Sequence, residues 1–110
     1  NPSPATPAGA VETFYGFAAR HRYADAWALA DPAFRAQLGD FPSFAAQQSH
    51  VRTLTFQRAV ATPAGPNAAT VSVATTPVLD TGTRHCAGTV QVVRSAGGGW
   101  LLHQISINCA

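Results

Sequence analysis

Hydrophobic and polar residues alternate along the last third of the chain, in two runs that flank a glycine-rich segment. Residues 84–94 and 100–109 alternate over most of their length, and residues 95–99 between them have the composition of a turn. A period of two is typical of a strand with one buried face. The pattern therefore predicts an antiparallel β-hairpin.

The two cysteines of the chain lie at the open end of this predicted hairpin. Counting outward from the turn places Val92 opposite His103 and Cys86 opposite Cys109. The same register puts five apolar residues on one face: Val90, Val92, Leu101, Ile105 and Ile107. Directly opposed residues of an antiparallel pair have Cα atoms roughly 4.5–5.5 Å apart, which a disulfide tolerates. We therefore expect a Cys86–Cys109 disulfide, and two buried free thiols are the alternative.

This disulfide bears on the location of the protein. In the chain-entropy model a loop of this size stabilises the fold by about 3 kcal/mol, and such bonds persist mainly outside the reducing cytosol. We expect an extracytoplasmic domain, either secreted or the ectodomain of a membrane-anchored protein. Residues 1–8 are rich in proline and are interpreted as a linker remnant, with a signal sequence or membrane anchor expected upstream.

The first half of the chain has helical spacing instead. Residues 7–20, 23–30 and 31–38 each carry apolar residues three or four apart, and Thr6-Pro7 and Asp31-Pro32 are typical helix starts. Residues 42–49 predict one or two further helical turns.

Two more strands precede the hairpin. Leu54, Phe56, Arg58 and Val60 alternate with polar or small residues, and residues 70–75 do the same, with a loop expected over 62–67. The predicted fold class is α+β, with N-terminal helices packed on a four-stranded antiparallel sheet, and residues 9–110 form one domain.

Charge argues against nucleic-acid binding. All seven basic residues are Arg, the net charge is +2, and the arginines are spread along the chain instead of clustering. No run approaches the roughly 18 apolar residues of a membrane-spanning helix. A membrane partner is therefore expected only through the upstream anchor.

The order of elements resembles the nuclear-transport-factor-2-like (cystatin-like) superfamily. Residues 10–34, with a helix, a short break, an Ala-Trp-x-Leu helix and a Pro-Phe turn, are similar to actinobacterial, extracytoplasmic members, and the hairpin of residues 90–107 matches their last strands. The resemblance implies a curved, cone-shaped sheet around a long first helix. It also implies a ligand-sensing or interaction module, although isomerases and cyclases share the fold.

Candidate catalytic groups are few. Asp25 or His103 could act in the cavity of an isomerase-like or cyclase-like enzyme, which needs a carboxylate base or an imidazole in an apolar pocket. A solvated helical face is the favoured explanation for Asp25, and a water-exposed hairpin position is the favoured explanation for His103. The other histidines lack metal-ligand spacing, so neither a metal nor another cofactor is expected.

The residues expected to line the cavity are mostly aromatic: Phe14, Phe17, Trp27, Phe34, Val92, His103 and Ile105. Core packing is the alternative explanation for the aromatic group. The leading functional hypothesis is a non-enzymatic sensing or interaction module that binds a small apolar molecule, an envelope component or a protein. A small enzyme and a structural spacer are the alternatives, and a homodimer through the sheet is left open.

Overall fold

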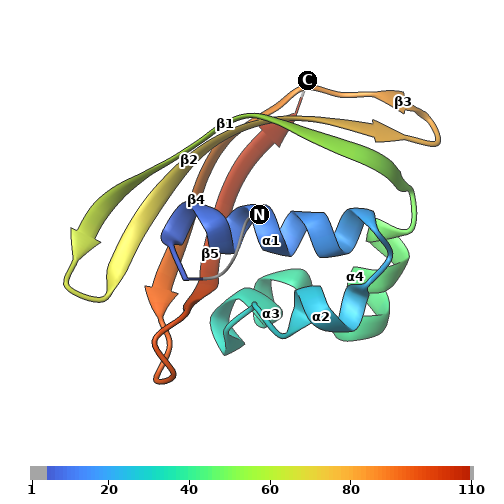
Figure 1. Ribbon diagram of the computed structural model, residues 1–110. Coiled ribbons are helices and arrows are strands. Elements are labelled where there is room, and N and C mark those ends of the chain that lie inside the picture. The colour runs from blue at the N-terminus through green and yellow to red at the C-terminus, as the bar shows by residue number, and fades with distance from the viewer. Residues whose placement is uncertain (1–4, 110) are drawn as a thin grey trace.

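Four helices fill the first half of the chain and an antiparallel sheet fills the second, in the computed structural model, which describes residues 5–109 (Figure 1). The helices are α1 Pro7–Ala19, α2 Tyr23–Trp27, α3 Pro32–Leu38 and α4 Phe41–Gln48. The strands are β1 Val51–Gly65, β2 Ala68–Leu79, β3 Gly82–Thr83, β4 Cys86–Arg94 and β5 Trp100–Cys109. All four helices lie on one face of the sheet, which curves over α1. The predicted α+β class is confirmed.

Side-chain caps and prolines start three of the helices. The side-chain oxygens of Thr6, Asp31 and Asp40 accept hydrogen bonds from the backbone at Gly9, Phe34 and Ser43, and each cap is followed by proline within two residues. Caps of this kind satisfy backbone N–H groups that a helix start leaves unpaired. The helices expected from the sequence are confirmed, although α2 is shorter than its predicted range. Residues 1–4 of the expected linker lie outside the described residues, and its residues 7 and 8 belong to α1.

The sheet is open and has the strand order β1-β2-β4-β5, with the two-residue strand β3 paired to the end of β2. The described residues thus form five strands instead of the four predicted. The edge strands β1 and β5 do not pair with each other, and the expected cone is not confirmed.

The predicted hairpin is formed by β4 and β5. Its open end has the expected register, with Val90 opposite Ile105, and a disulfide joins Cys86 to Cys109, whose Cα atoms are 4.0 Å apart. Near the turn the register shifts, because His103 is an extra residue in β5. Val92 therefore lies opposite Leu102, and the prediction that it opposes His103 is wrong.

The extra residue exchanges which leucine faces the helices. Leu102 is fully buried and Leu101 is only partly buried, the reverse of the expected pattern. The backbone of Leu102 is also held from the other side: its N–H donates to Leu29 O at 2.8 Å, and Asp31 N–H donates to its carbonyl at 2.9 Å. A β-bulge is the usual way to change the face that a strand presents partway along its length.

A second bulge alters the inner face of β1. The register shifts between Phe56 and Arg58, so Ala59 turns inward and Val60 is 54% exposed. The predicted alternation that put Arg58 and Val60 on the same face as Phe56 is therefore wrong. Residues 62–65 continue β1 instead of forming the expected loop, and the turn is confined to residues 66 and 67.

The core lies between α1 and the sheet, where α1 runs across the curved inner face (Figure 1). Phe14 of α1 contacts Phe34 and Phe44, with ring centroids 5.5 and 5.7 Å apart. The sheet contributes fully buried aliphatic residues: Val71, Val73, Val90, Val92 and Leu102. These side chains fill the space between α1 and the middle of the sheet.

Candidate functional site

An open-sided cavity of about 360 Å³ lies between the helices and the end of the sheet that carries the disulfide. Its walls come from α1, α4 and four strands. The lining residues are Tyr15, Gln47, Gln48, Val51, Leu54, Thr75, Pro77, Leu79, Arg84, Cys86, Ile105, Ile107 and Cys109. The volume and the mostly apolar lining are typical of a site for a small organic molecule.

Tyr15 supplies a hydroxyl among these apolar walls. Its ring packs edge-on against Phe14 and Phe56, with centroids 5.1 and 6.0 Å apart. Burial raises the pKa of Tyr15 from 10.0 to about 12, because the phenolate would lose its hydration. Its hydroxyl makes no hydrogen bond with another described residue. At neutral pH Tyr15 is therefore an uncharged group that can donate a hydrogen bond to a bound molecule.

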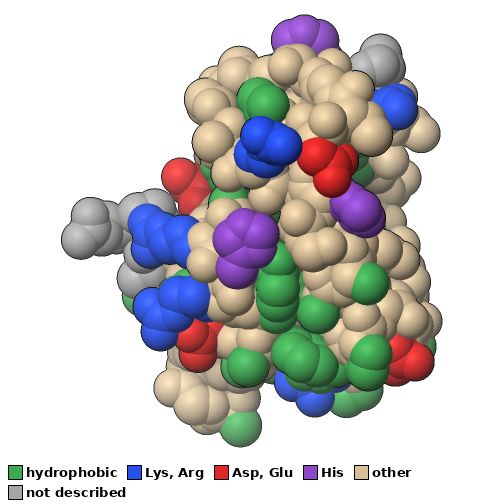
Figure 2. Space-filling view, turned by 90° about the vertical axis from the view of Figure 1, so that its right-hand side faces the viewer, with side chains coloured by type: hydrophobic (Ala, Val, Ile, Leu, Met, Phe, Trp, Pro, Cys, Tyr) green, Lys and Arg blue, Asp and Glu red, His purple; other side chains and the backbone are tan. Residues whose placement is uncertain are grey.

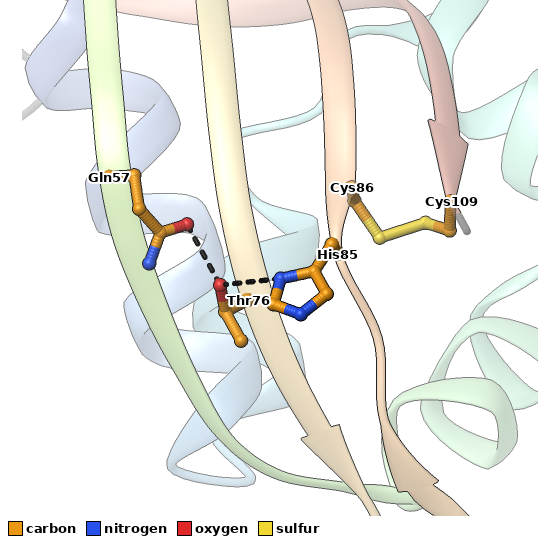
Figure 3. Close-up of a disulfide and its surroundings, with 5 residues drawn as sticks. All are labelled: Gln57, Thr76, His85, Cys86 and Cys109. Carbon is orange, nitrogen blue, oxygen red and sulfur yellow. Dashed lines mark hydrogen bonds between the residues drawn. A yellow bond between two sulfur atoms is a disulfide. The ribbon is translucent and has the colours of Figure 1, made fainter.

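The disulfide forms part of the cavity wall. Cys86 is 8% exposed and pairs with Thr75 of β2, so the bond ties the last strand to the middle of the sheet. A polar cluster lies beside it: the Thr76 hydroxyl is 2.9 Å from Gln57 Oε1 and 3.5 Å from His85 Nδ1 (Figure 3). None of these three side chains lines the 360 Å³ cavity.

Figure 2 shows one side of the molecule, where hydrophobic side chains reach the surface in the middle and lower part of the view, over the helices. Arg, Asp and His side chains lie around and above them. Phe41 of α4 is a large hydrophobic residue that is 37% exposed. Its ring meets Trp27 edge-on at 5.7 Å, and Trp27 in turn packs on the buried Phe44 at 5.5 Å.

His103 is positioned by the bulge in β5 to meet the cap of α3. Its Nδ1 lies 2.5 Å from Asp31 Oδ2, while Asp31 Oδ1 accepts the backbone N–H of Phe34. The Asp31 side chain is 12% exposed and that of His103 is 37% exposed. The pair joins the helical layer to the sheet edge. Neither residue lines the 360 Å³ cavity.

Asp25, the other candidate base, lies on the outside of α2. Its carboxylate forms an ion pair with Arg22 at 2.7 Å, and its side chain is 45% exposed. Asp25 is not among the residues that line the cavity. The structure therefore does not bring Asp25 and His103 into one apolar pocket.

The residues expected to line a cavity are spread over several parts of the domain. Ile105 lines the 360 Å³ cavity. Phe14, Phe34 and Val92 are buried in the core. Trp27 packs against Phe41 and Phe44, and Phe17 lies under the guanidinium of Arg22, 5.2 Å from its ring centroid; both are partly buried.

Most of the lining residues carry no local signal in the sequence. Leu79 and Pro77 lie beyond the predicted range of their strand, and Arg84 precedes β4 in a connection. Tyr15 belongs to the aromatic group of the first helix, but its neighbour Phe14 points into the core instead. Only the packing of helices against the sheet brings these groups together.

Two kinds of feature are absent from the described residues. No group of three or more His, Cys, Asp or Glu side chains among residues 5–109 is placed to hold a metal ion. Within the same part of the chain, no helix is long and apolar enough to cross a membrane.

Comparison with known proteins identifies the fold but not a family. No protein-family description matches the chain, and no curated protein matches it. The chain is similar to the solution structure of a SEC-C motif containing protein from Rhodopseudomonas palustris, with a TM-score of 0.74 and 17% identity over 94% of this chain and 80% of that one. The resemblance to nuclear-transport-factor-2-like proteins, including the sensor role it implied, is overturned by this finding and is withdrawn. At this level of identity the similarity shows a shared fold alone.

Proposed function

We propose that the domain is a non-enzymatic binding module that acts outside the cytoplasm and takes a small, mostly apolar molecule into the 360 Å³ cavity. The cavity itself is the observation that carries the proposal. Leu54, Leu79, Ile105 and Ile107 offer apolar contact, and the Tyr15 hydroxyl adds a neutral hydrogen-bond donor. Each buried methylene of a ligand contributes about 0.8 kcal/mol, so even a compact molecule gains enough to offset part of the cost of association.

The disulfide supports the proposed location. Cys86 and Cys109 form the one disulfide of the chain, and no free cysteine remains. Structural disulfides are kept mainly in oxidising compartments. Thiol alkylation of the protein in freshly lysed source cells tests this proposal: we expect no reactive thiol, and quantitative labelling of both cysteines before any reductant is added would contradict an extracytoplasmic location.

An enzymatic role has less support. General acid–base catalysis needs the titratable group within hydrogen-bond reach of the bound molecule. Asp31 and His103 bind each other at the edge of the sheet, and Asp25 pairs with Arg22, all away from the cavity lining. The cavity therefore holds a hydrogen-bond donor but none of the predicted catalytic groups.

A fluorescence titration tests the binding proposal. The neutral probe N-phenylnaphthylamine should bind the purified domain saturably, with the rise in emission that marks transfer to an apolar site. Leu54→Trp, which places an indole ring in the cavity, should weaken that binding at least about tenfold, since the new side chain takes the volume that the probe needs.

Val60→Trp is the matched control. Val60 is on the same strand but 54% exposed, and it does not line the cavity. The Val60→Trp variant should bind the probe as tightly as the wild type does. Equal loss of binding in both variants, or no saturable binding to a folded wild-type domain, contradicts the proposed site.

A further inference from the structure

One charged side chain lines the cavity. Of the thirteen lining residues only Arg84 carries a charge; it lies in the short connection between β3 and β4 and is exposed. Its backbone N–H donates to Pro77 O at 3.0 Å, which holds the connection against β2. The guanidinium makes no ion pair or hydrogen bond with another described residue. A cation at the rim of an apolar cavity is thus left without a partner from the described chain.

Three of the other six arginines have a side-chain partner among the described residues. Arg22 pairs with Asp25, Arg35 donates to Trp27 O at 3.0 Å and stacks on the Trp27 ring, and Arg94 stacks on Trp100. Compared with these, Arg84 is unusual because its neighbours in the cavity are uncharged. Lack of a partner alone is common for exposed arginines, and it is the position on the cavity rim that gives Arg84 its meaning.

Asp80, the acidic residue nearest to Arg84 in the sequence, already has a partner. Asp80 precedes β3, and its carboxylate lies 2.9 Å from His50 Nδ1; that hydrogen bond, together with the charges of His50 and Arg52, holds the pKa of Asp80 below its usual range. Asp80 is outside the cavity lining. It therefore does not supply the missing counter-charge for Arg84 within the cavity.

The remaining polar groups at the rim are neutral. Gln47 and Gln48, at the end of α4, offer amide donors and acceptors, and the Tyr15 hydroxyl stays protonated at neutral pH. One guanidinium among neutral donors matches one negative charge. A carboxylate fits this set best, because its two oxygens match the planar fork of a guanidinium, whereas a phosphate monoester would bring a second charge with no cation to meet it.

We infer that the ligand of this cavity is an amphiphilic carboxylate, whose apolar body lies against Leu54, Ile105 and Ile107 and whose head group is bound at the rim by Arg84. The inference rests on the proposed function and adds to it the chemistry of the head group. It makes Arg84 a determinant of specificity: the apolar walls take up neutral and charged amphiphiles alike, and the guanidinium selects among them.

Calorimetric titration with matched eight-carbon amphiphiles tests the inference. Octanoate should bind the wild-type domain about tenfold more tightly than octanol, because only the carboxylate gains the charge-assisted hydrogen bond. Arg84→Gln should remove that difference, by lowering the affinity for octanoate to the level of that for octanol. Arg84→Glu should reverse the preference, so that octylamine binds more tightly than octanoate.

Arg58→Gln is the control, since it removes the same charge from an exposed residue of β1 that lies outside the cavity lining. It should retain the preference for octanoate. Equal binding of octanoate and octanol to the wild type, or a preference that Arg58→Gln abolishes as fully as Arg84→Gln, overturns the role of Arg84 while leaving the cavity as a site. If neither compound binds and the neutral probe does not bind either, the proposed function fails together with the inference. Tighter binding of octyl phosphate than of octanoate overturns the choice of a carboxylate.

Discussion

Removing the disulfide is the perturbation whose magnitude follows most directly from the structure. Cys86 and Cys109 are 23 residues apart in the chain, and their bond closes a loop that contains the whole terminal hairpin. In the chain-entropy model, a loop of that length reduces the entropy of the unfolded chain by an amount worth about 3.4 kcal/mol at 298 K. A Cys86→Ala, Cys109→Ala variant should lose about this much stability.

That loss is large for a chain of this length. With an unfolding entropy of about 2.1 cal/mol/K per residue, a domain of 110 residues should melt about 15 °C lower without the bond. Urea unfolding followed by circular dichroism gives the free-energy difference, and a thermal melt gives the shift in Tm. The wild type in reductant should match the double variant.

Two results would refute this reasoning. A difference below about 1 kcal/mol would mean that the unfolded chain already holds the two strands together, or that the bond distorts the folded sheet. A reductant that destabilises the double variant as much as the wild type would show that reduction of this bond is not the cause.

Three other outcomes test separate parts of the structure. Gly88→Ala should destabilise the domain by about 2 kcal/mol in urea unfolding, because a Cβ would lie 2.1 Å from a backbone oxygen of β5; Gly16→Ala, in open space within α1, should instead stabilise it by about 0.5 kcal/mol. When the other tyrosine is replaced by Phe, Tyr15 should titrate near 12 in tyrosinate absorbance, and a midpoint near 10 contradicts its burial. Stability should fall as the pH rises from 10 to about 12, because Tyr15 ionises at a lower pH in the unfolded chain than in the folded one. Asp31→Ala should lower the free energy of unfolding by about 2 kcal/mol and Asp40→Ala by about 1 kcal/mol, because both residues cap helices but only Asp31 also binds a histidine. Equal losses in the two variants would show that the contact with His103 adds no stability.

Local rules predicted much of the fold. The caps at Thr6 and Asp31 mark helix starts because a short polar side chain before proline satisfies backbone donors whatever the rest of the chain does. The pairing of Cys86 with Cys109 follows from alternation along two runs joined by a short turn, where few registers bury the apolar face. Such features need only neighbours in sequence.

The two bulges were not predicted because they depend on contacts between residues that are far apart in the sequence. His103 is inserted in β5 where the backbone of Leu102 pairs with Leu29 and Asp31. The bulge near Gln57 turns Val60 outward without any break in the hydrophobic alternation of the sequence. Both change the buried face of a strand, and alternation assumes that this face stays the same.

By itself, the sequence determined the helices, the terminal hairpin and the disulfide, since each depends on residues close in the chain or on one short-range pairing. Tertiary structure alone decided the cavity, because its volume is what remains after α1 and α4 pack on the curved sheet. Its walls combine Tyr15 from a helix, Leu54 and Ile107 from opposite edges of the sheet, and Arg84 from a connection. No spacing along the chain encodes that juxtaposition; it arises from the distance at which the helical layer settles against the strands.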